Sequence, residues 1–270
     1  MNIKKNIAII GCGWLGLPLA SYFFNRGWRV FGSSRSEKKI EHLNNQGIDG
    51  FQLVLGEDFK CSSKDFLTEC EVLILNIPPG RYSGYEEKVV QLLNLISGSQ
   101  IKYILFVGST SVFANISGLV GDTELPKPDT EKQKEIYRSE QIISNHIDFS
   151  STVVRFGGLI GYDRHPGKFL SGRKSVPNPN HKVNLIHRDD CVEILYEIVS
   201  QHKWGAIYNA CGTEHPTRKD FYEKAAGAIG AELPQFIEDS KMEGKVIDSS
   251  KMLSDLRYKM KYPNPLDCIF

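Results

Sequence analysis

Short apolar runs alternate with amphipathic stretches along the first 160 residues of the chain. Asn6–Ile10, Val72–Leu75 and the run 103–107 have the length and composition of buried strands. The stretch 85–97 has apolar residues at the spacing of one helix face, namely Val89, Leu92, Leu93 and Ile96. Apolar strands that alternate with amphipathic helices predict an α/β fold with a parallel sheet covered on both faces.

Other stretches continue this rhythm. Strands are predicted at 28–32, 50–55, 151–156, 183–186 and 206–209, and helices at 14–25, 38–45, 130–144, 192–199 and 251–256. Ser62 with Asp65, and Thr217 with Asp220, have the spacing of helix-capping pairs. Residues 157–182 are rich in Gly, Pro, Arg and Lys, and we expect them to form one long loop.

The composition limits the class of protein. Lys and Arg total 33 and Asp and Glu total 32, and this net charge of +1 argues against a general nucleic-acid binder. With 24% charged and 41% hydrophobic residues, the composition excludes disorder and a polytopic membrane protein. The six cysteines form no CxxC pair and join no His cluster, so we expect no metal site and a reducing compartment.

Residues 7–24 carry no charge and follow Lys4 and Lys5, as they would in a signal peptide or membrane anchor. Small and rigid residues interrupt this run at Gly11, Gly13, Gly16 and Pro18. Because the strand–helix rhythm also continues beyond it, we favour a cytoplasmic protein with no membrane partner.

The run contains a glycine motif, Gly11-Cys12-Gly13-Trp14-Leu15-Gly16, directly after a predicted strand and at the start of a predicted helix. In a dinucleotide site the first glycine permits a tight turn, the second lets the pyrophosphate approach, and the third allows close helix–strand packing. The phosphates then lie at the helix N-terminus, next to the backbone of Trp14 and Leu15. The alternative is a glycine-rich turn that only packs two elements.

The end of the second predicted strand indicates which dinucleotide binds. An NAD site usually has an acidic residue about 20 residues past the motif, but no Asp or Glu precedes Glu37. Ser33, Ser34 and Arg35 stand there instead, and small hydroxyl residues with an arginine suit a 2′-phosphate. The sequence therefore favours NADP over NAD, unless Arg35 is simply a solvated loop residue.

Further segments occur in the order of a known family. They are the strand end 107–113, the acidic, proline-bearing loop 122–128, the segments 154–161 and 184–190, and Tyr208-Asn209. With the glycine motif, they make the chain resemble an extended or atypical short-chain dehydrogenase/reductase of the NAD(P)-dependent epimerase/dehydratase family.

The resemblance implies a Rossmann doubly wound parallel sheet with a smaller C-terminal substrate lobe. We expect an NAD(P)-binding domain at 1–157, to which 183–212 returns, and a substrate-binding lobe at 158–270. The family runs the loop of Asn76, Ile77 and Pro78 along the ribose and phosphates of the cofactor. It often forms homodimers through helices that correspond to 85–97 and 130–144.

The chain departs from the family where hydride transfer needs a Tyr-x-x-x-Lys pair. The matching positions hold Lys132 and Ile136, which cannot do that chemistry. Tyr137 is a candidate acid/base, but the residue four positions later is Gln141, which carries no charge to lower a phenol pKa. Lys134 lies one turn before Tyr137 and could substitute, while the alternative is a Tyr137 that only packs.

Two serines match further positions of the family's catalytic site. Ser109 matches the serine that bonds substrate and the tyrosine hydroxyl, and Ser111 a second hydroxyl; alternatively both satisfy backbone groups. The basic loop residues Arg164, His165 and Lys168 suggest a small substrate with an anionic group. Two hypotheses follow: an NAD(P)-dependent epimerase, dehydratase or reductase of unknown substrate, or a catalytically inactive dinucleotide-binding regulatory or sensor protein.

Overall fold

The computed structural model describes residues 5–79, 84–114, 116–237 and 244–269. The chain divides into two compact units. The first consists of Met1–Gly108, Pro128–Val154 and Ile194–Ile207, and the second of Ser109–Lys127, Arg155–Glu193 and Tyr208–Phe270. Each unit is therefore assembled from segments that are far apart in the sequence.

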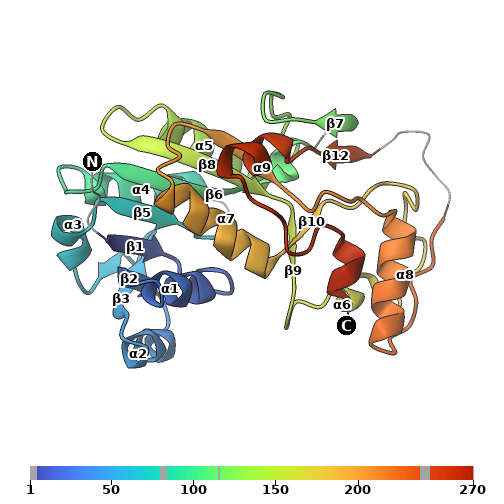
Figure 1. The fold of residues 1–270 in the computed structure, drawn as a ribbon, viewed down its shortest axis with the longest axis horizontal. Coiled ribbons are helices and arrows are strands. Elements are labelled where there is room, and N and C mark those ends of the chain that lie inside the picture. Colours follow the sequence, from blue (N-terminus) through green and yellow to red (C-terminus); the bar gives the residue numbers. More distant parts are fainter. Residues whose placement is uncertain (1–4, 80–83, 115, 238–243, 270) are drawn as a thin grey trace. The chain divides into compact units, whose positions relative to one another are not determined.

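Among the described residues, the main sheet has eight strands in the order β11-β8-β6-β5-β1-β2-β3-β4 (Figure 1). The strand bounds are β1 Asn6–Ile10, β2 Arg29–Ser34, β3 Asp49–Val54, β4 Lys60–Cys61, β5 Val72–Leu75, β6 Tyr103–Ser109, β8 Ser150–Phe156 and β11 Ile207–Ala210. β1 pairs in parallel with β2 and β5, and only the short β4 is antiparallel to its neighbour β3 among the pairings described. This confirms the predicted α/β fold of doubly wound, Rossmann type.

The chain first builds the sheet outward from β1 through β2 and β3, and then returns to place β5 on the other side of β1. β1 and β5 are apolar because both faces are covered, and the side chains from Ile7 to Ile10 are fully buried. The order therefore reverses beside β1. At such a switch point, the loops that leave adjacent strand ends diverge and leave room for a ligand.

Helices connect these strands. Their bounds are α1 Gly16–Phe24, α2 Glu37–Asn45, α3 Asp65–Glu69, α4 Tyr85–Ile96, α5 Glu131–Ser144 and α7 Arg188–Ser200. α2 packs against β2 and β3, and α4 packs against α5. α1 begins two residues later than its apolar pattern predicts, because the glycine turn extends to the cap residue Leu15.

One predicted capping pair is wrong. Ser62 does not cap α3, because its Oγ accepts the Gln52 amide of β3 at 2.8 Å. The residue before the helix is Lys64, and the Asp65 amide donates to Ser63 Oγ at 3.2 Å. The spacing was suitable, but a strand hydrogen bond engages the hydroxyl.

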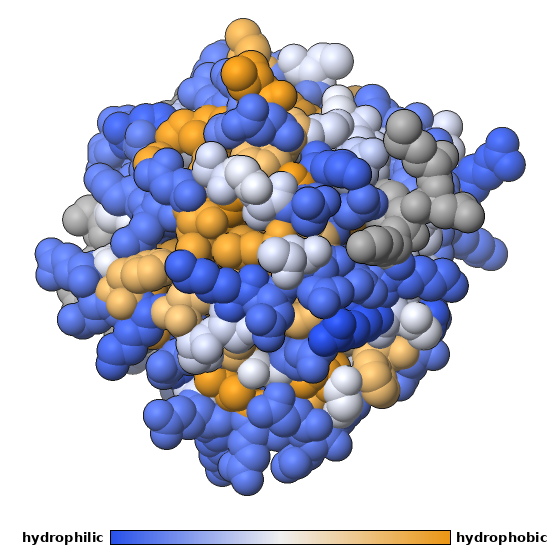
Figure 2. All heavy atoms as spheres, turned by 90° about the vertical axis from the view of Figure 1, so that its left-hand side faces the viewer, coloured by the Kyte–Doolittle hydropathy of each residue, from blue (hydrophilic) through white to orange (hydrophobic). Residues whose placement is uncertain are grey.

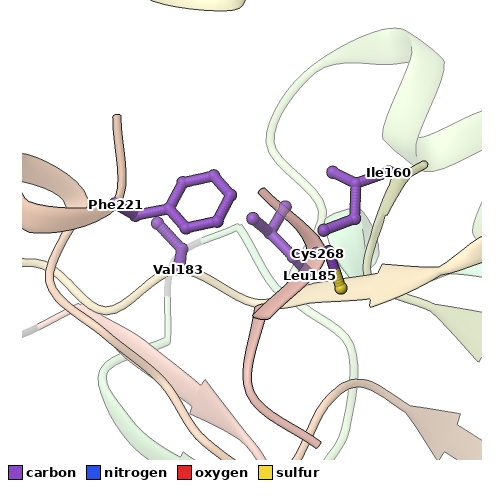
Figure 3. Packing of buried hydrophobic residues seen from close by; sticks show 5 residues of the cluster. All are labelled: Ile160, Val183, Leu185, Phe221 and Cys268. Atoms are coloured by element: carbon purple, nitrogen blue, oxygen red, sulfur yellow. The ribbon is translucent and has the colours of Figure 1, made fainter. Parts of the chain in front are cut away.

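The second unit contains smaller elements, whose bounds are β7 Gly118–Val120, β9 Gly158–Ile160, α6 Gly167–Leu170, β10 Leu185–His187, α8 Arg218–Ala228, β12 Lys245–Ile247 and α9 Ser250–Leu256. β9 and β10 pair in parallel, as do β7 and β12. Figure 3 shows the buried apolar cluster of this unit, formed by Ile160, Val183, Leu185, Phe221 and Cys268.

The expectation of one long loop over 157–182 is wrong, since this segment contains β9 and α6. Ile160 and Leu170 are buried, so the unit's core orders both elements although the local sequence is rich in loop-forming residues. The capping of α8 is confirmed, because Thr217 Oγ1 accepts the Asp220 amide at 3.1 Å.

Hydrophilic side chains predominate on the face that Figure 2 shows, and apolar ones gather near its middle. No helix in the described residues is long and apolar enough to cross a membrane.

Candidate functional site

The turn after β1 is shaped by Gly11, whose φ of 102° lies in the left-handed region. A Cβ atom at this position would lie 2.6 Å from the Asn76 carbonyl oxygen, so a larger residue would collide with the backbone. The Gly11 amide donates to Ser33 Oγ at 3.0 Å, and the Cys12 amide donates to the Ser33 carbonyl at 2.7 Å. The turn is thereby tied to the end of β2.

The other two glycines of the motif have different surroundings. A Cβ atom on Gly16 would lie 2.2 Å from the Gly11 carbonyl oxygen and 2.8 Å from Asn76 Nδ2, so α1 starts in close contact with the turn. A Cβ atom on Gly13 would meet no described atom within 4 Å apart from those of its two chain neighbours. Gly13 therefore faces open space beside the start of α1, whose first turn carries no acidic residue to repel an anion.

The end of β2 brings hydroxyl groups and cations together. Ser33 is buried, and Ser34 Oγ accepts the Ser36 amide at 3.2 Å, which shapes the link to α2. Arg35 is exposed on this link, and Lys39 follows in the first turns of α2. The two cations are four residues apart on one short segment.

The loop after β5 lies against the glycine turn. The Asn76 amide donates to the Ile10 carbonyl at 2.9 Å, and Asn76 Nδ2 donates to the Gly11 carbonyl at 3.0 Å. At the next residue of the loop, the Ile77 carbonyl accepts a hydrogen bond from Tyr85 Oη at 3.0 Å. These hydrogen bonds fix the position of the loop.

The glycine turn, the end of β2 and the loop after β5 surround a pocket of about 420 Å³ within the first unit, a volume in the range of small-molecule sites. Its lining residues are Gly11, Cys12, Gly13, Ser33, Ser34, Arg35, Ser36, Lys39, Leu53, Leu55, Ile77, Pro78 and Lys88. The residues expected at a cofactor that do not line it are Trp14, Leu15, Gly16 and Asn76. Gly16 and Asn76 instead contact the Gly11 carbonyl of the turn, and Leu15 is buried.

The charge of this pocket is one-sided. Arg35, Lys39 and Lys88 line it, and no Asp or Glu is among its described lining residues. A pocket with three cations and no acid favours a ligand that carries several negative charges.

Several residues that line the pocket are not predicted from the sequence. Lys39 could have been predicted as a second cation of the site, because it lies only four residues after Arg35, in the first turn of the helix that follows. Leu53 lies in β3 and Leu55 directly follows the strand, and their spacing of two residues predicts a shared direction but not a ligand. Lys88 gave no signal, because only the packing of α4 brings it to the pocket.

Cys12 is not a reactive thiol. Burial raises its pKa to about 12, although the backbone at Ser33 and the charge of Lys39 oppose the rise. Its Sγ lies 3.7 Å from the Ile9 carbonyl, so the side chain is a neutral part of the pocket wall.

The candidate catalytic residues are divided between the units. Ser109 and Ser111 belong to the second unit, where Ser109 Oγ accepts the Ser111 amide at 3.2 Å. Tyr137 belongs to the first unit and is half-buried on α5. Ile136, at the position matched to the family's lysine, is 3% exposed and packs in the core. In the described residues, no group of His, Cys, Asp and Glu side chains is arranged to hold a metal ion.

Residues 6–113 match the family model described as the NAD binding domain of 6-phosphogluconate dehydrogenase. This match covers β1 through the end of β6, and so includes all the described residues that line the pocket.

Solved structures share the fold at low sequence identity. A functionally unknown conserved protein from Silicibacter pomeroyi has a TM-score of 0.79 at 20% identity, with 98% of this chain and 96% of that chain covered. UDP-glucuronic acid 4-epimerase from Bacillus cereus, in complex with NAD, has a TM-score of 0.78 at 14% identity, with the same coverage. These likenesses concern the fold.

A curated relative is much closer in sequence. Protein YeeZ of Escherichia coli strain K12 is 35% identical over 270 residues, and the alignment covers 97% of this chain and 98% of YeeZ. The identity extends over both units, and the chain therefore belongs to the same family as protein YeeZ.

Proposed function

We propose that the chain binds NADP(H) in the pocket of the first unit, as an epimerase-, dehydratase- or reductase-like protein that acts on a small substrate. The observation that carries this proposal is the pocket itself, in which Gly13 faces open space and the lining charges are Arg35, Lys39 and Lys88. A guanidinium beside the end of β2 suits a 2′-phosphate, whereas an NAD site usually has an acid there.

The roles in this proposal follow from position. The pyrophosphate would approach Gly13 at the start of α1, and Arg35 with Lys39 would hold the 2′-phosphate. Leu53 and Leu55 supply an apolar wall for a base. The match of residues 6–113 to an NAD binding domain supports a nicotinamide dinucleotide, which would supply the hydride chemistry.

Titration of NADPH and NADH against the wild type and Arg35→Ala tests the cofactor. We expect the wild type to prefer NADPH, and Arg35→Ala to weaken NADPH binding about tenfold with little change for NADH, because an exposed charge-assisted contact is lost. Arg26→Ala is the control, since Arg26 stacks on Tyr22 in the same unit and does not line the pocket. Equal wild-type affinities for both dinucleotides would overturn the preference for NADP.

A second candidate is a dinucleotide-binding regulatory or sensor protein without catalysis. It is favoured by the buried Ile136 and by Gln141, which stand where a charged lysine would be needed. A panel of small substrates with bound cofactor distinguishes the two candidates, because the sensor predicts tight NADPH binding without turnover. If turnover is found, unchanged turnover in Tyr137→Phe would exclude Tyr137 as the acid/base.

The substrate panel should include anionic compounds. We propose that Arg164, His165 and Lys168 contribute positive charge to substrate binding. Lys168 is exposed on α6, while His165 Nδ1 accepts the Gly167 amide at 3.1 Å. We further propose that the protein is cytoplasmic and forms a homodimer through α4 and α5. Light scattering of the purified chain would test whether it is a dimer.

A further inference from the structure

The N-terminus of α4 is capped by a residue from another helix. Gly84, the cap position of α4, provides no side-chain hydrogen bond. Glu135 of α5 supplies the acceptors, because its carboxylate oxygens accept the Gly84 amide at 2.9 Å and the Tyr85 amide at 3.2 Å. Glu135 is 8% exposed, so this carboxylate is taken out of water to satisfy helix amides.

Tyr85, the first residue of α4, connects this cap to the pocket. Its side chain is 2% exposed, and its Oη donates to the carbonyl of Ile77, which lines the pocket. Burial, together with the nearby Glu140 carboxylate, raises the pKa of the Tyr85 phenol, so the hydroxyl keeps its proton and remains a donor. One turn further along α4, Lys88 also lines the pocket.

We propose that Glu135 and Tyr85 are positioning residues for the dinucleotide pocket. Glu135 fixes the start of α4, and α4 in turn sets two parts of the pocket wall: Ile77 through the Tyr85 hydroxyl, and Lys88 through its place on the helix. Neither Glu135 nor Tyr85 lines the pocket. This inference rests on the proposed function, because it assigns these residues a role in binding the same cofactor.

The test uses Tyr85→Phe and Glu135→Gln in the full chain. NADPH affinity is measured by fluorescence titration, and thermal unfolding is measured without cofactor. Tyr103→Phe is the matched control, because Tyr103 stacks on Trp204 at 4.9 Å at the start of β6 and does not line the pocket. We expect each variant at Tyr85 or Glu135 to raise the Kd for NADPH about fivefold, and the control to leave it unchanged.

The double variant shows whether the two residues act through one path. Glu135→Gln weakens the bonds that hold the backbone at Tyr85, and Tyr85→Phe removes the bond from the same residue to Ile77. Because both changes act on the link from α4 to Ile77, we expect the Kd of the double variant to rise by clearly less than the product of the two single effects. Glu135→Gln combined with Tyr103→Phe should show no such coupling, since Tyr103 stacks on Trp204 whereas Glu135 accepts amides at the start of α4.

The outcomes separate the inference from the proposed function. If the wild type binds NADPH and Tyr85→Phe binds it equally well, the inference is wrong and the proposed function stands. If affinity falls only in proportion to lost thermal stability, in the control as well as in the other variants, the residues are structural and the inference is also wrong. A wild type that binds neither NADPH nor NADH overturns the proposed function, and the inference with it.

Discussion

Alanine at Gly13 and at Gly16 should separate cofactor binding from folding. A methyl group on Gly16 would lie 2.2 Å from the Gly11 carbonyl oxygen, which belongs to the backbone and cannot move aside cheaply. Overpacking of this kind costs about 3 kcal/mol. In a chain of this size that corresponds to a melting temperature lower by about 6–12 °C.

Gly13→Ala should leave the stability of the protein nearly unchanged and weaken cofactor binding. Apart from the two chain neighbours, no described atom lies within 4 Å of the added methyl group, so the stability of the cofactor-free protein should change by less than about 1 kcal/mol. The methyl group would instead occupy space that a pyrophosphate needs. We therefore expect the Kd for NADPH to rise at least about tenfold, or about 1.4 kcal/mol.

Differential scanning fluorimetry without cofactor and fluorescence titration with NADPH measure the two effects. If Gly13→Ala binds NADPH like the wild type, Gly13 does not face the pyrophosphate. If Gly16→Ala melts at the wild-type temperature, the close approach of Gly16 to the Gly11 carbonyl does not limit the packing of α1. Variants at both positions change the same residue type in one motif, so each serves as the control for the other.

Three further predictions concern the second unit. Burial raises the pKa of Asp122 from 3.8 to about 6, so the folded carboxyl binds its proton more tightly, and the free energy of unfolding should fall as the pH rises from about 4 to about 6. Urea unfolding at pH 4.5 and at pH 7 measures this fall, which should be about 1 kcal/mol smaller in Asp122→Asn than in the wild type, after allowing for partial exposure. Thr217→Ala removes the cap on the Asp220 amide and should cost about 1 kcal/mol in urea unfolding, whereas Thr217→Ser should retain most of it. Phe221→Ala empties a fully buried site of the cluster in Figure 3 and should cost about 3–5 kcal/mol; a loss below 1 kcal/mol would show that the cluster is not a core.

The local pattern of apolar residues was sufficient to predict the bounds of strands that are buried on both faces. Asn6–Ile10 and Val72–Leu75 begin and end in the structure where the sequence predicts, because a continuous apolar run bounded by polar residues has only one way to be buried. The turn at Gly11 was equally predictable, since a positive φ beside a close backbone contact requires glycine. Around 157–182 the pattern failed, because contacts from distant segments order a sequence without strong local preference.

The sequence by itself determined the α/β class, the glycine turn and the cation Arg35 at the end of β2, because each depends on residues that are neighbours along the chain. Only the tertiary structure decided the composition of the pocket. The return of the chain to place β5 beside β1 brings Ile77 to the glycine turn, and the packing of α4 adds Lys88 to the wall. These residues are separated by tens of positions, and side chains so far apart meet only when burial of the sheet and helix faces fixes the topology.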